Sequence, residues 1–338
     1  MSVVTLPAQP GHDTARGPVP WRGLVWVTWR QHRATLIAVP AVLGAVAIFL
    51  VIFGLKVHHD YAALVNCPLD QGQQSSACAK MFSTFNSTDW PLGNTCAILI
   101  GLAPVLIGAF AGAPLLAREL ETGTYRFAWT QGLIRERQAI AKLALLGVTL
   151  VVLAGAFGVL FSWFFQPFLY AEQMNRLTEG VFDTGGIVFP AFTLVAFATG
   201  AFLGMLFRRV IPALAATLGV YLAIRLVAWG VRKYYPVAVV TGNSKIFGQF
   251  ETPSVPGYPW ILSSWVTGPG GKPASQSVAN QILNGPPGAS VPPGYTEWNR
   301  WIPLSHYWPM QFIEAGWLLV LAVALMAGTV WLVRHRAA

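Results

Sequence analysis

Six long apolar stretches alternate with polar intervals along the chain. They cover residues 34–55, 93–117, 139–165, 187–207, 211–231 and 313–333. About 20 mostly apolar residues in a helix are enough to cross the hydrocarbon core of a bilayer. The pattern therefore predicts an all-α polytopic membrane protein with six transmembrane helices.

The composition supports a membrane protein. Of the 338 residues, 54% are hydrophobic and only 10% are charged, whereas soluble domains carry about 25% charged residues. The formal net charge of +9 would suggest a nucleic-acid partner in a soluble protein. Membrane proteins, however, collect Lys and Arg in their cytoplasmic loops. We therefore expect a multi-pass protein of the cell membrane with no nucleic-acid partner.

Basic residues gather in alternate intervals, and this orients the chain. The N-terminal tail, residues 115–142, the Arg208–Arg209 pair and the C-terminal end are basic, whereas the first two intervals between them hold only Lys56, Lys80 and Arg176. The positive-inside rule then places both termini in the cytoplasm. The interval 232–312 also contains basic residues, but long loops translocate largely regardless of charge.

The N-terminal part divides into a tail and an amphipathic segment. Residues 1–20 are polar and rich in Pro and Gly, without the apolar core of a signal peptide, so we predict a disordered cytoplasmic tail. Residues 21–33 form an interfacial helix in our interpretation, because Trp21 and Trp29 share one side at helical spacing, while the arginines gather on another side with Trp26 among them. A plain basic flank before the first span is the alternative.

Two intervals are predicted to be external. Residues 56–92 contain Cys67 and Cys78, which would form a disulfide in an oxidising compartment, with two free thiols as the alternative. Residues 232–312 are rich in Pro, Gly, Ser and Trp, which is typical of a loop-rich external module without a regular core. Residues 313–338 then form the sixth transmembrane helix and a cytoplasmic C-terminus.

The predicted spans contain few charges. Arg225 lies in the outer third of the fifth span, where its side chain can extend to the outer interface. Glu314 lies at the outer start of the sixth span. Coupling to protons or sodium usually uses carboxylates near the bilayer midplane. The near absence of such groups indicates that energy for transport would come from a partner at the cytoplasmic face.

The chain carries no recognisable catalytic motif. The nearest match to a phosphate-binding loop, Gly270-Gly271-Lys272, is followed by Pro273 and lies in the predicted external module. The sequence also lacks the HExxH and GxSxG motifs and a Cys/His cluster with zinc spacing. We therefore expect a protein that is not an enzyme and that binds no metal or cofactor directly.

A charged connector joins the second and third spans. Residues 118–138, within the interval 115–142, hold alternating acids and bases in a chain that is otherwise poor in charge. A short helix restarts near Leu133, with a few apolar anchors and a charged rim, a shape that suits docking into a groove of another protein. A solvated loop without a partner is the alternative.

The connector also resembles a known family. Glu119-Leu-Glu-Thr-Gly-Thr-Tyr, followed by Arg135 and Lys142, is similar to the stretch after the second span of ABC-2-type permeases, the membrane subunits of one class of ABC transporters. The segments WRQHR before the first span and YWPMQFIE before the last are similar to actinobacterial members. With six spans, the resemblance covers nearly the whole chain.

The resemblance implies a membrane-spanning subunit of an ATP-driven exporter. A separate ATP-binding subunit would hydrolyse ATP, and a second permease chain, identical or different, would complete the assembly in the bilayer. The residues implied to couple to the ATPase are Glu119, Glu121, Gly123, Thr124, Arg135 and Arg137. The substrate would be hydrophobic or amphipathic, such as a drug, antibiotic, peptide or lipid. The competing hypothesis is a membrane-embedded sensor or accessory protein with a ligand-binding external module.

Overall fold

The computed structural model describes residues 21–67, 69–70, 73–74, 76–122, 135–171, 175–236, 238–242, 260–284 and 292–336. Within these residues, six helical segments are long and apolar enough to cross a membrane. They are Ile37–Val65, Ser76–Glu121, Glu136–Leu169, Val188–Phe207, Val210–Arg232 and Leu304–His335. The predicted number and order of the spans are confirmed.

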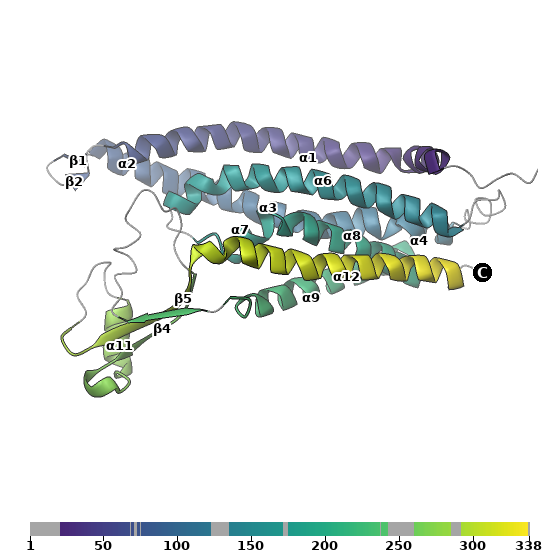
Figure 1. The fold of residues 1–338 in the computed structure, drawn as a ribbon. Helices are drawn as coiled ribbons and strands as arrows, with labels where there is room; N and C mark the ends of the chain where they lie inside the picture. Colours follow the sequence, from purple (N-terminus) through teal and green to yellow (C-terminus); the bar gives the residue numbers. More distant parts are fainter. Residues whose placement is uncertain are drawn as a thin grey trace, which may run out of the picture.

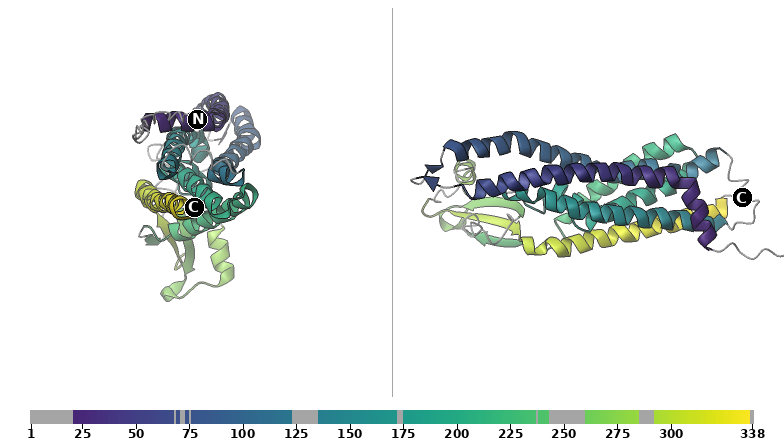
Figure 2. Two further views of the ribbon diagram at one scale, coloured as in Figure 1. Left: turned by 90° about the vertical axis from the view of Figure 1, so that its right-hand side faces the viewer. Right: turned by 90° about the horizontal axis from the view of Figure 1, so that it is seen from above.

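The helices form an elongated bundle (Figure 1). The long helices are α1 (Trp21–Val65), α3 (Trp90–Ile107), α6 (Arg135–Ala171), α8 (Val188–Phe207), α9 (Val210–Arg232) and α12 (Tyr307–Arg336). The shorter helical pieces are α2 (Ser76–Thr84), the π-helical turns η1 (Phe85–Asp89) and η2 (Gly108–Gly112), α4 (Pro114–Glu121), α7 (Glu179–Thr184) and the 3₁₀ turn η4 (Leu304–His306). The start of α1 and the C-terminal end of α12 lie at the same end of the bundle (Figure 2).

The first helix extends beyond the predicted span at both ends. Helix α1 includes the predicted interfacial segment and continues ten residues past Leu55. It can continue because Lys56 Nζ donates to Asp60 at 2.9 Å and to Asp89 at 2.7 Å, so the charges are paired. The N-terminal part of α1 turns sharply away from the rest of the helix (Figure 2). The described part of the interval 56–92 is therefore largely helical, so the loop between the first two spans is shorter than predicted.

Glycines allow an unusually close crossing between η2 and α8. A Cβ atom on Gly200 would lie 2.2 Å from the Gly108 carbonyl oxygen, and one on Gly204 would lie 2.3 Å from that of Ala113. Gly108 and Gly112, like Gly200 and Gly204, are four residues apart, the spacing of the small-residue motif in membrane helix pairs. The crossing fixes α8 at the centre of the bundle, where 83% of its span is buried.

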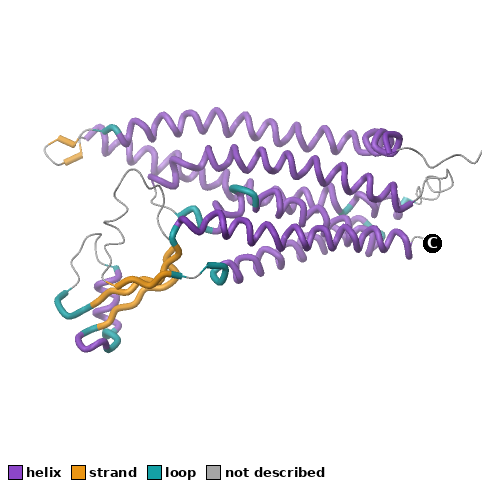
Figure 3. Tube along the Cα trace, viewed as in Figure 1, coloured by secondary structure: helices purple, strands orange, loops and turns teal. Residues whose placement is uncertain are grey.

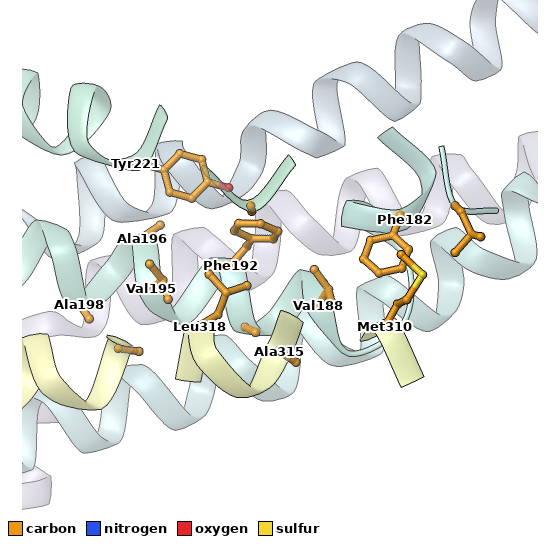
Figure 4. Packing of buried hydrophobic residues seen from close by; sticks show 14 of the residues in the cluster. Phe182, Val188, Phe192, Val195, Ala196, Ala198, Tyr221, Met310, Ala315 and Leu318 are labelled. Carbon is orange, nitrogen blue, oxygen red and sulfur yellow. The ribbon is translucent and has the colours of Figure 1, made fainter. Parts of the chain in front are cut away.

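Apolar clusters fill the rest of the bundle. One joins α8, α9 and α12, with Phe192, Val195 and Leu318 packed together (Figure 4). A second joins α1, α3 and α6 and contains the buried rings of Phe161, Phe164, Phe165 and Phe168. A third, around Leu116 and Leu146, packs the other end of the bundle. Helix α8 contributes to all three clusters.

A small sheet lies at the end of the bundle opposite the C-terminus (Figure 3). Strands β3 (Val239–Gly242), β5 (Thr296–Ile302) and β4 (Trp260–Thr267) are antiparallel in that order. The 3₁₀ turn η3 (Pro269–Gly271) and helix α11 (Gln276–Leu283) follow β4. A two-stranded ribbon, β1 (Leu69–Asp70) with β2 (Gln73–Gln74), caps the end of α1. We call residues 238–302 the β-module.

The β-module differs from the loop-rich segment that the sequence predicted. Trp298 lies in the Trp-rich interval that the sequence predicts to be loop-rich, and such a composition also suits an aromatic belt at a membrane surface. In the structure it lies on β5 and stacks on Trp265 of β4 with ring centroids 6.4 Å apart. Tryptophan is common both in interfacial belts and in strands, so composition alone could not separate the two. The described Pro- and Gly-rich run, Gly268-Pro269-Gly270-Gly271, follows β4 and forms the 3₁₀ turn η3.

Candidate functional site

The base of the connector is held by a partly buried ion pair. Helix α4 presents Glu119 and helix α6 presents Lys142, whose ammonium group donates to the Glu119 carboxylate. Lys142 is only 1% exposed, and lysine is almost never this buried unless it is paired. The pair therefore fastens the helix that enters the connector to the helix that leaves it.

A second acidic residue links the connector to α9. Glu121 Oε2 accepts a hydrogen bond from the backbone amide of Val210, the first residue of α9, at 3.1 Å. Helix N-termini favour negative charge, and α9 has neither an acidic residue in its first turn nor a side-chain cap from Arg209. Arg208 adopts a left-handed conformation with φ of 56°, which makes the turn into α9 tight enough for this contact.

The structure thus brings two of the predicted coupling residues into contact with α6, at Lys142, and with the start of α9. Gly123 and Thr124 lie outside the described residues. Arg135 is the first residue of α6, and its side chain also lies outside the described part. Arg137 follows on the same helix and is half-buried. The role of all six residues in coupling stays a prediction.

Four charged side chains meet at the other end of the bundle. Arg232 of α9 donates to Glu314 of α12 from Nε at 2.9 Å and from Nη2 at 2.6 Å, and it also donates to Asp183 of α7. Arg225 Nη2 donates to the other Asp183 oxygen at 2.6 Å, and Nη1 donates to the Gly101 carbonyl at 3.3 Å. We call Asp183, Arg225, Arg232 and Glu314 the outer charge network, because they lie at the end of the bundle that the sequence predicts to be external.

The outer charge network is almost completely buried. Glu314 is 0% exposed, Arg232 1% and Asp183 5%, whereas the side chain of Arg225 is 26% exposed. The Arg232 guanidinium also lies 4.2 Å from the ring centroid of Phe182. Two positive and two negative charges balance, which is the condition under which charges can be buried at all.

This network changes the interpretation of the charges that the sequence singled out. We expected Arg225 to extend alone toward the outer interface, but its guanidinium turns inward to Asp183 because a buried carboxylate lies within reach. Glu314 likewise pairs with Arg232. Sequence analysis missed Asp183 and Arg232, because partners 42 to 82 residues apart leave no local pattern. The available signal was weaker: Asp183 lies just before the fourth span and Glu314 at the start of the sixth, at the same end of the bundle at which Arg225 and Arg232 lie near the end of the fifth.

Gln311 connects α12 to the turn before α8. Its Oε1 accepts from the amides of Ile187 and Val188 at 3.1 and 3.0 Å, and its Nε2 donates to the Phe182 carbonyl at 3.0 Å. Gly186 has a φ of +60°, and a Cβ there would lie 2.6 Å from Gln311 Oε1. The side chain of Gln311, one turn before Glu314, therefore provides the acceptor that the first amides of α8 lack within the helix.

A further hydrogen bond joins the segment after α9 to α12. Trp317 Nε1 donates to the Tyr235 hydroxyl at 2.9 Å. Burial raises the pKa of Tyr235 above its ordinary value, while the Trp317 bond acts in the opposite direction. The hydroxyl therefore stays protonated at physiological pH and accepts this bond without a change of charge.

Two of the cysteines are paired in the structure. The structure joins Cys67 to Cys78 by a disulfide, with Cα atoms 6.0 Å apart, and leaves Cys96 free. Within the described part of the chain, no group of three or more His, Cys, Asp or Glu residues could hold a metal ion. That the protein binds no metal stays an expectation.

Six spanning helices, with a connector and a charge network at opposite ends, define a multi-pass membrane protein. The family model described as "ABC-2 membrane transporter related" matches residues 40–232. This is more than half of the chain, so the protein belongs to that family and is an ABC-type permease. The match includes the connector, Arg225 and Arg232, and ends before the β-module. Comparisons with curated proteins and with solved structures found no match.

Proposed function

We propose that this chain is the membrane subunit of an ATP-driven exporter, and that a separate ATP-binding subunit drives it through the connector at residues 115–142. One observation supports this most directly. Glu119 pairs with Lys142 at the start of α6, and Glu121 accepts from the first amide of α9. A force applied to the connector would therefore reach two membrane helices at once.

The transport mechanism follows from these links. When the ATP-binding subunits close on ATP, they push on the connector, and α4, α6 and the start of α9 move together. The glycine crossing of η2 with α8 leaves no space for the two helices to approach further, so they tilt as a unit. Such rigid tilting alternates access between the two membrane faces. Two permease chains and two ATP-binding subunits form the working assembly, and ATP binds only to the partner.

The orientation follows from the basic residues and the disulfide. The connector and the Arg208–Arg209 turn face the cytoplasm in this proposal. The Cys67–Cys78 disulfide and the β-module face outward, because disulfides persist in oxidising compartments and are rare in the cytosol. The apolar spans suit a hydrophobic or amphipathic substrate, and we propose outward transport of such a molecule.

The test is co-purification and ATP hydrolysis with an ATP-binding cassette protein from a neighbouring reading frame. The wild-type chain should form the complex and raise the ATPase rate. The double charge reversal Glu121→Lys with Arg135→Glu should lower that rate about tenfold, since a charge-assisted hydrogen bond contributes about 1.5–3 kcal/mol, while membrane insertion remains normal. Asp60→Asn, which removes an acid from α1 far from the connector, is the matched control. A fully active double variant would contradict the proposal.

The competing function is a sensor or accessory protein whose β-module binds a ligand. The sheet of β3, β5 and β4 gives this hypothesis a folded module in place of loops. Reconstituted vesicles separate the two functions. A permease moves a substrate when the ATP-binding subunit and ATP are supplied, whereas a sensor binds its ligand at the β-module without net transport.

A further inference from the structure

The outer charge network joins three segments that are far apart in the chain. Asp183 lies on the short helix before α8, Arg225 and Arg232 lie on α9, and Glu314 lies near the start of α12. Arg232 contacts both acids, so it connects α7 with α12. Without these contacts, the outer ends of the three helices would lose their buried ionic link.

Buried ion pairs contribute little net free energy to holding helices together. Desolvation offsets most of their attraction, and apolar side chains of similar volume often stabilise a fold equally well. Charge pairs are better suited to a contact that forms in one state and breaks in another. The outer charge network is therefore better suited to a contact that forms and breaks during a conformational cycle than to a permanent one.

The closed network also contains features that favour its opening. Arg232 Nη1 is buried and has no hydrogen-bond partner among the residues that the structure describes. This raises the free energy of the closed state, because a buried donor without a partner is costly. Asp183 is shared between two arginines, so it can leave one and stay paired with the other. Arg225, the most exposed member, is where water or a substrate would enter first.

The network lies at the far end of the helix that the connector contacts. Glu121 binds the first residue of α9, Val210, and Arg232 is its last residue. The chain enters the β-module just after Arg232 and returns from it just before α12. Movement of α9 would therefore act on the network from one side, and movement of the β-module would act on it from the other.

We propose that Asp183, Arg225, Arg232 and Glu314 form the outer lock of the transport pathway, which opens in each cycle when α9 moves. This inference rests on the proposed export function. Asp183 and Arg232 are positioning residues: they hold the outer ends of α7, α9 and α12 together until ATP-driven movement separates them. Opening breaks the contacts that Arg232 makes with both acids, exposes the network to water and frees the outer end of the pathway.

The test places a cysteine beside the lock without changing its charges. Thr184 follows Asp183, is 1% exposed and is replaced by a residue of similar size in Thr184→Cys, in a Cys96→Ser background. The complex with the ATP-binding subunit is treated with a membrane-impermeant thiol reagent, with and without ATP. Tyr234→Cys, at a position that is 73% exposed, is the control that should react equally in both conditions.

The lock predicts that ATP hydrolysis accelerates labelling at position 184 about tenfold or more, which corresponds to breaking one charge-assisted hydrogen bond. It also predicts that Asp183→Asn gives the same acceleration without ATP, whereas Asp60→Asn does not. If the complex hydrolyses ATP and position 184 reacts at an unchanged rate, the lock is wrong. A failure to form an ATP-hydrolysing complex would instead contradict the proposed function.

A second cysteine position allows the same measurement if the Thr184→Cys variant does not fold. A Cβ on Gly101, whose carbonyl accepts from Arg225, would meet only the Thr184 methyl group at 3.8 Å. Gly101→Cys should therefore fold and should show the same ATP-dependent labelling. An ATP-independent rate at both reporters would overturn the proposal.

Discussion

Arg232 binds Glu314 through two parallel hydrogen bonds, from Nε at 2.9 Å and from Nη2 at 2.6 Å, with both side chains buried. This two-point geometry is the strongest form of an arginine–carboxylate pair. Because it joins the last residue of α9 to the start of α12, it fixes how the β-module leaves and re-enters the bundle. The pair makes the outer end of the bundle sensitive to the loss of a single charge.

Removing one partner of this pair should destabilise the protein strongly. Glu314→Leu leaves the buried guanidinium of Arg232 with Asp183 as its remaining acidic partner, and breaking a buried pair costs about 3–5 kcal/mol. The double variant Arg232→Met with Glu314→Leu should lose less, because the uncompensated charge is gone. Thermal unfolding of the purified protein in detergent measures both. A Glu314→Leu protein as stable as the wild type would contradict this account of the network.

The crossing of η2 and α8 should tolerate no side chain at Gly200. A methyl group there would lie 2.2 Å from the Gly108 carbonyl oxygen, so Gly200→Ala must push the helices apart and should cost about 1–3 kcal/mol or more. Gly219→Ala is the matched control, because nothing lies within 4 Å of a Cβ at that position in α9. Equal melting temperatures for the two variants would show that the helices do not cross this closely.

The spans could be predicted from the sequence because bilayer thickness sets the length of an apolar helix. The contacts that position them could not. Lys56 marked a span end by its charge, but its pairing with Asp89 lets α1 continue. The strand around Trp298 has the composition of a membrane-surface belt. The outer charge network could not be predicted from the sequence, because Asp183 and Arg232 are 49 residues apart and come into contact only when the helices pack.

In the connector, the sequence pointed to two residues that do have specific contacts, but with other partners than predicted. The sequence predicts that Glu119 and Glu121 contact the ATP-binding subunit, whereas in the structure each contacts another helix of the same chain. Their spacing of two residues directs them to different helices, because positions two apart on a helix do not share a face. An acidic motif can thus transmit force inside the permease as well as at a surface.

The Cys67–Cys78 disulfide allows a test of orientation. Intact cells expressing the Cys96→Ser variant should show no labelling by a membrane-impermeant maleimide until a mild reductant is added, after which the Cys67 thiol, the more exposed of the two, should react. The disulfide closes a short loop, and its loss should cost about 2–3 kcal/mol. Labelling that requires permeabilised cells would place this end of the bundle in the cytoplasm and reverse the proposed orientation.

The central claim is that an ATP-binding subunit contacts this permease at the connector. A photoactivatable cross-linker attached to Thr122→Cys tests this contact directly. Thr122 follows α4 and is the last residue before the centre of the connector that the structure describes. We predict that irradiation captures the ATP-binding subunit from position 122 and not from Tyr234→Cys at the opposite end. Capture from position 234 alone, or nucleotide binding by the purified permease without a partner, would contradict the claim.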